Sequence, residues 1–187
     1  MSAARDRWLD EGLRVLATEG AAGVRIDRIA VRLGLSKGSF HHHFAGADGY
    51  KRDLLAHYEA LSVGALASAI DEVGEHAETQ DVLEALTALV RSDGPGLYRP
   101  ELDVAVRAWS TFDADVREVQ QRIDTTRVDA LQRVWSRAVP TTDEARLAAL
   151  LPYLLAVGAA VVVPPVPADD LRRLYEILLP LVPAAGP

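Results

Sequence analysis

The fold is decided by residues 26–44, which read IDRIAVRLGLSKGSFHHHF. The first eight of these residues have apolar side chains at helical spacing, and the Gly34 that follows permits the positive φ of a tight turn. Ser36 occupies the N-cap position of a second short helix, in which Phe40 and Phe44 lie four residues apart on one face. This spacing is typical of a helix-turn-helix, whose second helix enters the major groove of DNA, but a generic helical hairpin has the same spacing.

The polar side chains of the second helix favour DNA binding over the generic hairpin. They are short hydrogen-bond donors or cations that leave the apolar face clear, and such groups suit phosphates and base edges. Arg25 and Arg28 flank the start of the preceding helix and are expected to contact the DNA backbone. The expected contacts on the second helix itself are Ser36, Lys37, Ser39, His41, His42 and His43.

The three adjacent histidines do not predict a metal site. Consecutive residues of a helix point about 100° apart, so three neighbouring imidazoles cannot converge on one ion. No Asp or Glu stands nearby in helical register to complete a set of ligands. We therefore expect neither a metal nor another cofactor.

The rest of the chain is expected to be helical as well. No pair of alternating runs flanks a hairpin turn, so a sheet is not predicted. Thr141 and Glu144 form the pattern of a capping box in front of an apolar helix. The fold class is therefore all-α, with about nine helices. They cover residues 5–19, 26–33, 37–44, 48–73, 81–91, 100–111, 114–138, 144–163 and 170–179.

Residues 8–58 resemble the TetR family of bacterial transcriptional regulators. The similarity is carried by RIDRIA at residues 25–30 and LGLSKGSFHHHF at residues 33–44. The resemblance implies a three-helix helix-turn-helix DNA-binding domain at residues 1–47 and a helical ligand-binding and dimerisation domain at residues 48–187. It also implies a cytoplasmic bacterial regulator, a repressor by analogy, that binds palindromic operator DNA as a homodimer. A small-molecule effector would release such a protein from DNA.

Two positions depart from the family pattern at the DNA backbone. His41 stands where the family usually has a tyrosine, and it can still donate a hydrogen bond to phosphate, more strongly when protonated. Ala47 stands where the family favours a lysine at the start of the connecting helix. Lys51, one turn later, is the expected replacement for that phosphate contact, and the alternative is that the contact is missing.

Charge is unevenly distributed along a chain whose net charge is −7. Residues 1–52 hold nine Lys and Arg against six Asp and Glu, a balance of +3, and the remainder holds 11 basic and 21 acidic residues, a balance of −10. A mildly basic front on an acidic body suits contact with a polyanion at one end. An enzyme is not expected, because the chain has no cysteine, no Gly-x-Ser-x-Gly, no phosphate loop and no His-Glu-x-x-His. Charged residues among the first 20 predict that no secretory signal peptide begins here.

From Leu147 to Ala168 the chain carries no charge, which is close to the length of a membrane span. Pro152, Gly158 and the prolines after Val163 favour a buried or interface helix instead. The resemblance implies that the helices at 144–163 and 170–179 pair across a homodimer into a four-helix bundle. The alternative is that their leucines fill the core of one protomer.

The resemblance further implies a small-molecule pocket among the central helices. Such pockets are mostly apolar with a few polar groups. The candidate lining residues are His57, Tyr58, Tyr98, Arg107, Trp109, Phe112, Trp135 and Tyr153. The rival to a DNA-binding regulator is a helical small-molecule-binding or protein-interaction module without DNA binding.

Overall fold

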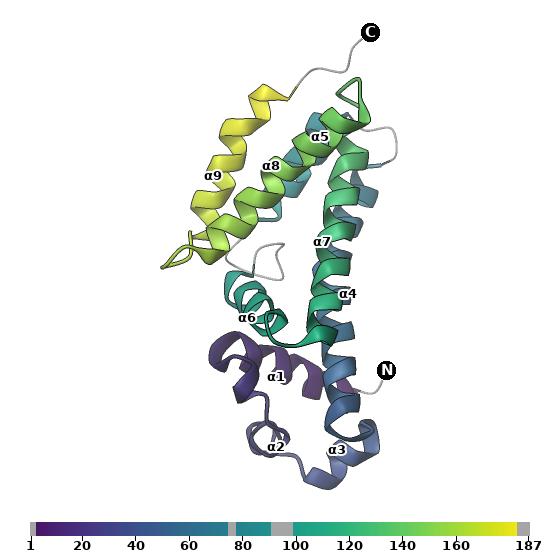
Figure 1. Ribbon diagram of the computed structural model, residues 1–187, viewed down its shortest axis with the longest axis vertical. Coiled ribbons are helices and arrows are strands. Elements are labelled where there is room, and N and C mark those ends of the chain that lie inside the picture. Colours follow the sequence, from purple (N-terminus) through teal and green to yellow (C-terminus); the bar gives the residue numbers. More distant parts are fainter. Residues whose placement is uncertain (1–2, 75–77, 91–98, 183–187) are drawn as a thin grey trace. The chain divides into compact units, whose positions relative to one another are not determined.

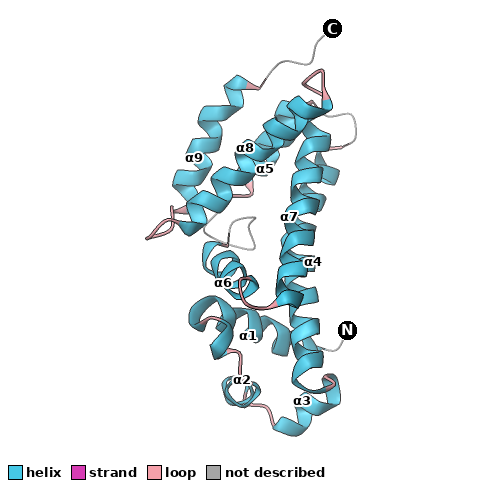
Figure 2. Cartoon of the chain, viewed as in Figure 1, coloured by secondary structure: helices cyan, strands magenta, loops and turns pink. Residues whose placement is uncertain are grey.

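The computed structural model describes residues 3–74, 78–90 and 99–182 and confirms the all-α class. Figure 2 shows helices joined by loops, and the described residues contain no strand. Two short 3₁₀ turns, Ala21–Gly23 and Leu179–Leu181, accompany the α-helices. In chain order (Figure 1) these are α1 Ala3–Glu19, α2 Ile26–Leu33, α3 Lys37–His43, α4 Gly46–Val73, α5 Thr79–Ala88, α6 Pro100–Ser110, α7 Ala114–Trp135, α8 Thr142–Val161 and α9 Ala168–Leu178.

Two helices end three residues earlier than the sequence pattern predicts, at 88 and not 91 and at 135 and not 138. Helix α5 ends at Ala88, where the Leu89 N–H donates to the Leu86 carbonyl at 3.2 Å in a tight turn, and α7 ends at Trp135 in a similar way. The expected capping box is confirmed, with Thr141 and Glu144 hydrogen-bonded reciprocally at the start of α8. The loop expected at 92–96 lies outside the described residues.

The chain divides into two compact units. The first contains residues 1–61 and 101–121, and the second contains residues 62–100 and 122–187. The expected functional division after residue 47 remains a prediction, because α4 runs without interruption across that position and the compact units divide the chain elsewhere.

An aromatic cluster forms the core of the first unit. Trp8 of α1 is fully buried and makes edge contacts with Phe40, Phe44 and Tyr50, at ring-centroid distances of 5.3, 6.5 and 6.5 Å. The Tyr50 hydroxyl donates a 2.7 Å hydrogen bond to the Trp8 carbonyl. Without this bond the buried hydroxyl would have no hydrogen-bond partner, which costs free energy. Burial also raises the pKa of Tyr50 well above its ordinary value, so the hydroxyl remains a donor. This cluster joins α1 and α4 to the back of α3.

The second unit has two apolar cores. One is built on Leu66 of α4, Val82 of α5 and Val134 of α7. The other joins Ala159 and Ala160 of α8 to Leu171 of α9. The leucines of α8 do not all enter these cores: Leu147, Leu151 and Leu154 are 61, 50 and 59% exposed. This unit therefore carries an apolar face that its own core does not use.

Candidate functional site

The turn between α2 and α3 is closed by backbone geometry. Gly34 has φ 64° and ψ 29°, the left-handed conformation that favours glycine. The Leu35 N–H donates to the Ala30 carbonyl at 2.9 Å and the Gly34 N–H to the Val31 carbonyl at 3.1 Å. These bonds satisfy the last carbonyls of α2 and hold the angle between the two helices.

Helix α3 begins as the sequence predicts. The Ser36 side chain accepts a hydrogen bond from the Ser39 N–H at 3.2 Å, which caps the helix. Phe40 and Phe44 are 0 and 4% exposed and face the aromatic cluster. Since these two phenylalanines take the inner side of a helix of only seven residues, the other side is left for contact with a partner.

The polar residues of α3 lie mostly on that outer side. Ser36, His41 and His42 are exposed, while Ser39 and His43 are half-buried. The His43 ring packs between those of His42 and Phe44, at centroid distances of 5.1 and 6.3 Å. The Lys37 side chain lies outside the described part of the chain, although its backbone forms the first residue of α3. Among the described residues no group of three His, Cys, Asp or Glu side chains could hold a metal ion.

Both arginines expected at the DNA backbone are exposed and near a carboxylate. Arg25 contacts Asp27 at 3.2 Å, and its hydrogen bond lowers the pKa of that carboxyl below the ordinary value. Arg28 lies 3.9 Å from Glu19. More than half of each arginine side chain is exposed, so water screens these pairs and either guanidinium can exchange its carboxylate for a phosphate.

Lys51 lies in a different environment from the one its sequence position suggests. Its Nζ is 2.7 Å from Asp113 and 2.9 Å from Asp115, and 5.9 Å from the centroid of the Trp109 ring. Asp113 also accepts the Val116 N–H at the start of α7. Burial works against the charge of Lys51, but the hydrogen bonds to the two carboxylates raise its pKa above the ordinary value. In the structure Lys51 therefore joins α4 to the start of α7 through two carboxylates, which compete with the phosphate contact expected from the sequence, and that contact itself stays a prediction.

The side chains proposed from sequence as a ligand pocket are distributed over both compact units, and their role in binding stays a prediction. His57 contacts Asp10 at 2.8 Å, and the buried Tyr58 donates to Asp103 at 2.8 Å. Arg107 and Trp109 are half-buried in the first unit, where Phe112 is 73% exposed. Trp135 and Tyr153 belong to the second unit and pack against its larger core. Tyr98 lies outside the described residues.

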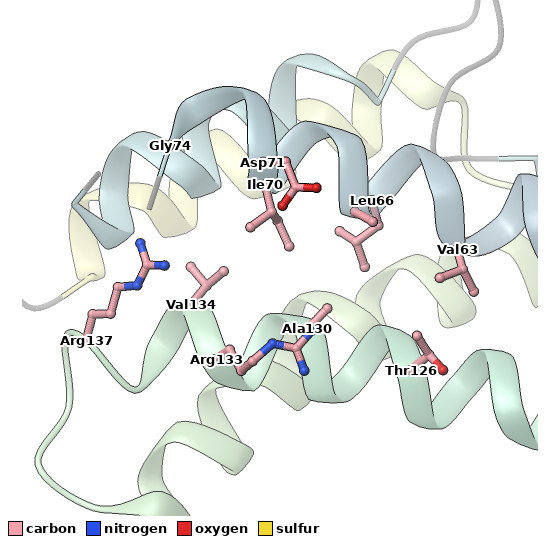
Figure 3. Close-up of a pocket in the computed structure, with 11 residues that line it drawn as sticks. Val63, Leu66, Ile70, Asp71, Gly74, Thr126, Ala130, Arg133, Val134 and Arg137 are labelled. Carbon is pink, nitrogen blue, oxygen red and sulfur yellow. The ribbon is translucent and has the colours of Figure 1, made fainter. Parts of the chain in front are cut away.

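A cavity of about 460 Å³ lies between α4 and α7 within the second unit. Figure 3 shows apolar side chains of the two helices facing each other across it, among them Leu66, Ile70 and Val134. Arg133, Arg137 and Asp71 line the same space. The seven expected pocket residues that the structure describes are not among those that line this cavity.

Comparisons with known proteins agree with this geometry. Residues 9–57 match the family model described as bacterial regulatory proteins, tetR family. No curated protein matches the chain. The fold is similar to that of NemR from E. coli in its reduced form, with a sequence identity of 16% and a TM-score of 0.74. The similarity covers 98% of this chain and 100% of the NemR chain. A TetR-family regulator from Agrobacterium tumefaciens has 15% identity, coverage of 97% and 98%, and a TM-score of 0.75. A transcriptional regulator from Saccharomonospora viridis in complex with choline has 24% identity, coverage of 96% and 97%, and a TM-score of 0.68.

Proposed function

We propose that this chain, of the TetR type by its N-terminal domain and its fold, is a transcriptional repressor that binds palindromic operator DNA. The single observation that carries the proposal is helix α3: its apolar side is sealed by Phe40 and Phe44, while His41 and His42 are exposed beside the Ser36 cap. A short, rigidly held helix with outward donors is suited to the major groove. The proteins it resembles are transcription factors and not enzymes.

The proposed DNA-bound form is a homodimer. Two recognition helices reach one face of a duplex when they lie about 34 Å apart, which requires two copies of the domain. The apolar face of the second unit suits this pairing, since it combines the exposed leucines of α8 with Leu174 and Ile177 of α9, which are 42 and 68% exposed. Burial of such a face against its symmetric copy removes apolar surface from water.

Helix α8 has the length and apolar composition of a membrane span, and 22% of its apolar window is buried. We assign its exposed leucines to the dimer, and the protein to the bacterial cytoplasm, where its operator lies. A small molecule would release the DNA by favouring a different arrangement of the two copies, through a coupling free energy of about 1–3 kcal/mol. The choline bound to the Saccharomonospora viridis protein supports the idea of a ligand in this fold.

The proposal is tested by selecting fragments of the source genome on the purified protein and measuring their affinity by gel shift. A regulator retains a specific, palindromic subset with strong salt dependence. The double variant K37A/H42A should lose that subset while keeping the helical circular dichroism and melting temperature of the parent. Arg133→Ala, which removes an exposed charge from α7 in the second compact unit, is the matched control. Equal retention by parent and double variant would refute the assignment of α3 as the recognition helix.

A further inference from the structure

We propose that helix α1 positions the helix-turn-helix for DNA through a clamp on the end of α2, and that Arg7 is the principal positioning residue of this clamp. The clamp consists of Arg7, Glu11 and Glu19 of α1, which contact Arg32 and Leu33, the last two residues of α2. All five residues belong to the first compact unit. The inference deepens the proposed function and rests on it, because it concerns how α2 and α3 are held for binding.

Arg7 supplies a hydrogen-bond donor at the C-terminus of α2. Its guanidinium Nη2 donates to the Leu33 carbonyl at 3.0 Å. The backbone bonds of the turn end on the carbonyls of Ala30 and Val31, so Arg7 pairs a carbonyl that lies beyond them at the helix end. A cation at this end of a helix is also favoured by the helix dipole. Since Leu33 directly precedes the glycine of the turn, the bond ties α1 to the point where the chain turns toward α3.

The second part of the clamp is a set of ion pairs around Arg32. This arginine lies 3.7 Å from Glu11 and forms a closer ion pair with Glu19. Glu11 is 12% exposed, and the hydrogen bonds from Arg14, aided by the charge of Arg32, outweigh burial and hold the pKa of its carboxyl below the ordinary value. Glu19 also lies 3.9 Å from Arg28, a residue expected at the DNA backbone. Carboxylates of α1 therefore hold the last turn of α2 from a second direction.

The clamp keeps the two helices of the motif in register for DNA. Helix α2 has eight residues, of which Ile29 and Ala30 are buried, so its apolar contacts lie in its middle and the clamp holds its end. Contacts from α2 to phosphates set the register in which α3 meets the base edges. A helix that is held in place before binding avoids the loss of affinity that comes from ordering a loose one. We therefore expect the clamp to act on operator affinity as well as on stability.

The experiment compares Arg7→Met and Arg7→Lys with the parent, by amide hydrogen exchange without DNA and by gel shift on the selected operator. Loss of the hydrogen bond in Arg7→Met should speed exchange of the Gly34 and Leu35 amides by roughly two- to tenfold and weaken operator binding by a similar factor. Arg7→Lys keeps a donor and the charge and should recover most of both effects. Thr141→Ala is the matched control, because it removes a cap hydrogen bond in the second unit. It should lower the melting temperature and leave operator affinity and the turn amides unchanged.

The salt dependence of binding separates positioning from a direct phosphate contact. Arg7→Met should keep the slope of log affinity against log salt, whereas loss of a phosphate contact lowers that slope by about 0.9. A slope lowered by this amount would overturn the proposal, as would turn amides that exchange as in the parent or the absence of recovery in Arg7→Lys.

The two assays also separate the clamp from the proposed function. Specific DNA binding that Arg7→Met leaves unchanged upholds the regulator and refutes the positioning role. A parent protein that retains no specific DNA refutes the proposed function, while faster exchange of the turn amides in Arg7→Met still upholds the hold of α1 on the turn.

Discussion

Replacement of Lys51 by methionine should lower the stability of the protein without changing the salt dependence of DNA binding. The ammonium lies 2.7 Å from Asp113 and 2.9 Å from Asp115, and its side chain is only 24% exposed. Asp113 is 22% exposed, so it would be left partly buried without its cation, whereas Asp115 at 72% exposure loses little. We expect a cost of about 1–2 kcal/mol, which corresponds to a fall of roughly 2–8 °C in melting temperature for a chain of this size.

The pH dependence of this loss has a defined sign. Burial alone would raise the pKa of Asp113, but hydrogen bonds from Lys51 and from the Val116 N–H hold it below the ordinary value. A carboxyl with a lowered pKa contributes stability that is present above its unfolded pKa, about 3.9, and is lost as the pH falls through the folded value. The difference in melting temperature between parent and Lys51→Met should therefore shrink in acid.

The two assays for Lys51 are thermal melting by circular dichroism and operator affinity against salt concentration. Arg52→Met, on the same turn of α4 but exposed, is the matched control for stability. Lys37→Met is the control for salt dependence and should reduce the slope of log affinity against log salt by about 0.9. A reduction of that size in Lys51→Met, with no loss of stability, would refute our interpretation and make Lys51 a phosphate contact.

Three further substitutions test other parts of the structure. Gly12→Ala should destabilise the protein by about 1–3 kcal/mol in urea unfolding, because the new Cβ would overlap the Tyr50 hydroxyl oxygen. Alanine has the better helix propensity, so an increase in stability would contradict the packing described. Thr141→Ala removes the N-cap of α8 and should cost about 1 kcal/mol in the same assay, with Thr141→Ser close to the parent. Leu154→Asp, on the exposed face of α8, should shift sedimentation from dimer toward monomer and weaken operator binding, and an unchanged dimer would exclude this face as the interface.

The helix-turn-helix could be predicted from sequence because its signals are local. A glycine at the turn, a serine at the cap and two phenylalanines four residues apart act over a few bonds, and each is found in the expected role. The capping box of α8 was predictable for the same reason. The ends of α5 and α7 were less predictable, because their last turns depend on packing as well as on propensity.

The roles of single charged and aromatic side chains could not be predicted in this way. Lys51 and Asp113 are 62 residues apart in the chain, and Tyr58 and Asp103 are 45 apart, so nothing near either residue in sequence indicates its partner. The aromatic residues proposed for a pocket were selected by composition. Composition does not tell which compact unit a side chain joins or whether it faces a cavity.

The order of residues along the chain determined the helices, the turn that sets α3 against α2, and the side of α3 that is left exposed. These follow from backbone geometry and from apolar spacing within one or two turns of helix. Only the tertiary structure decided that Lys51 is held by two carboxylates at the start of α7 and that a space between α4 and α7 is lined by Arg133, Arg137 and Asp71. Both depend on distances between helices that are remote in sequence, and packing of the cores sets those distances.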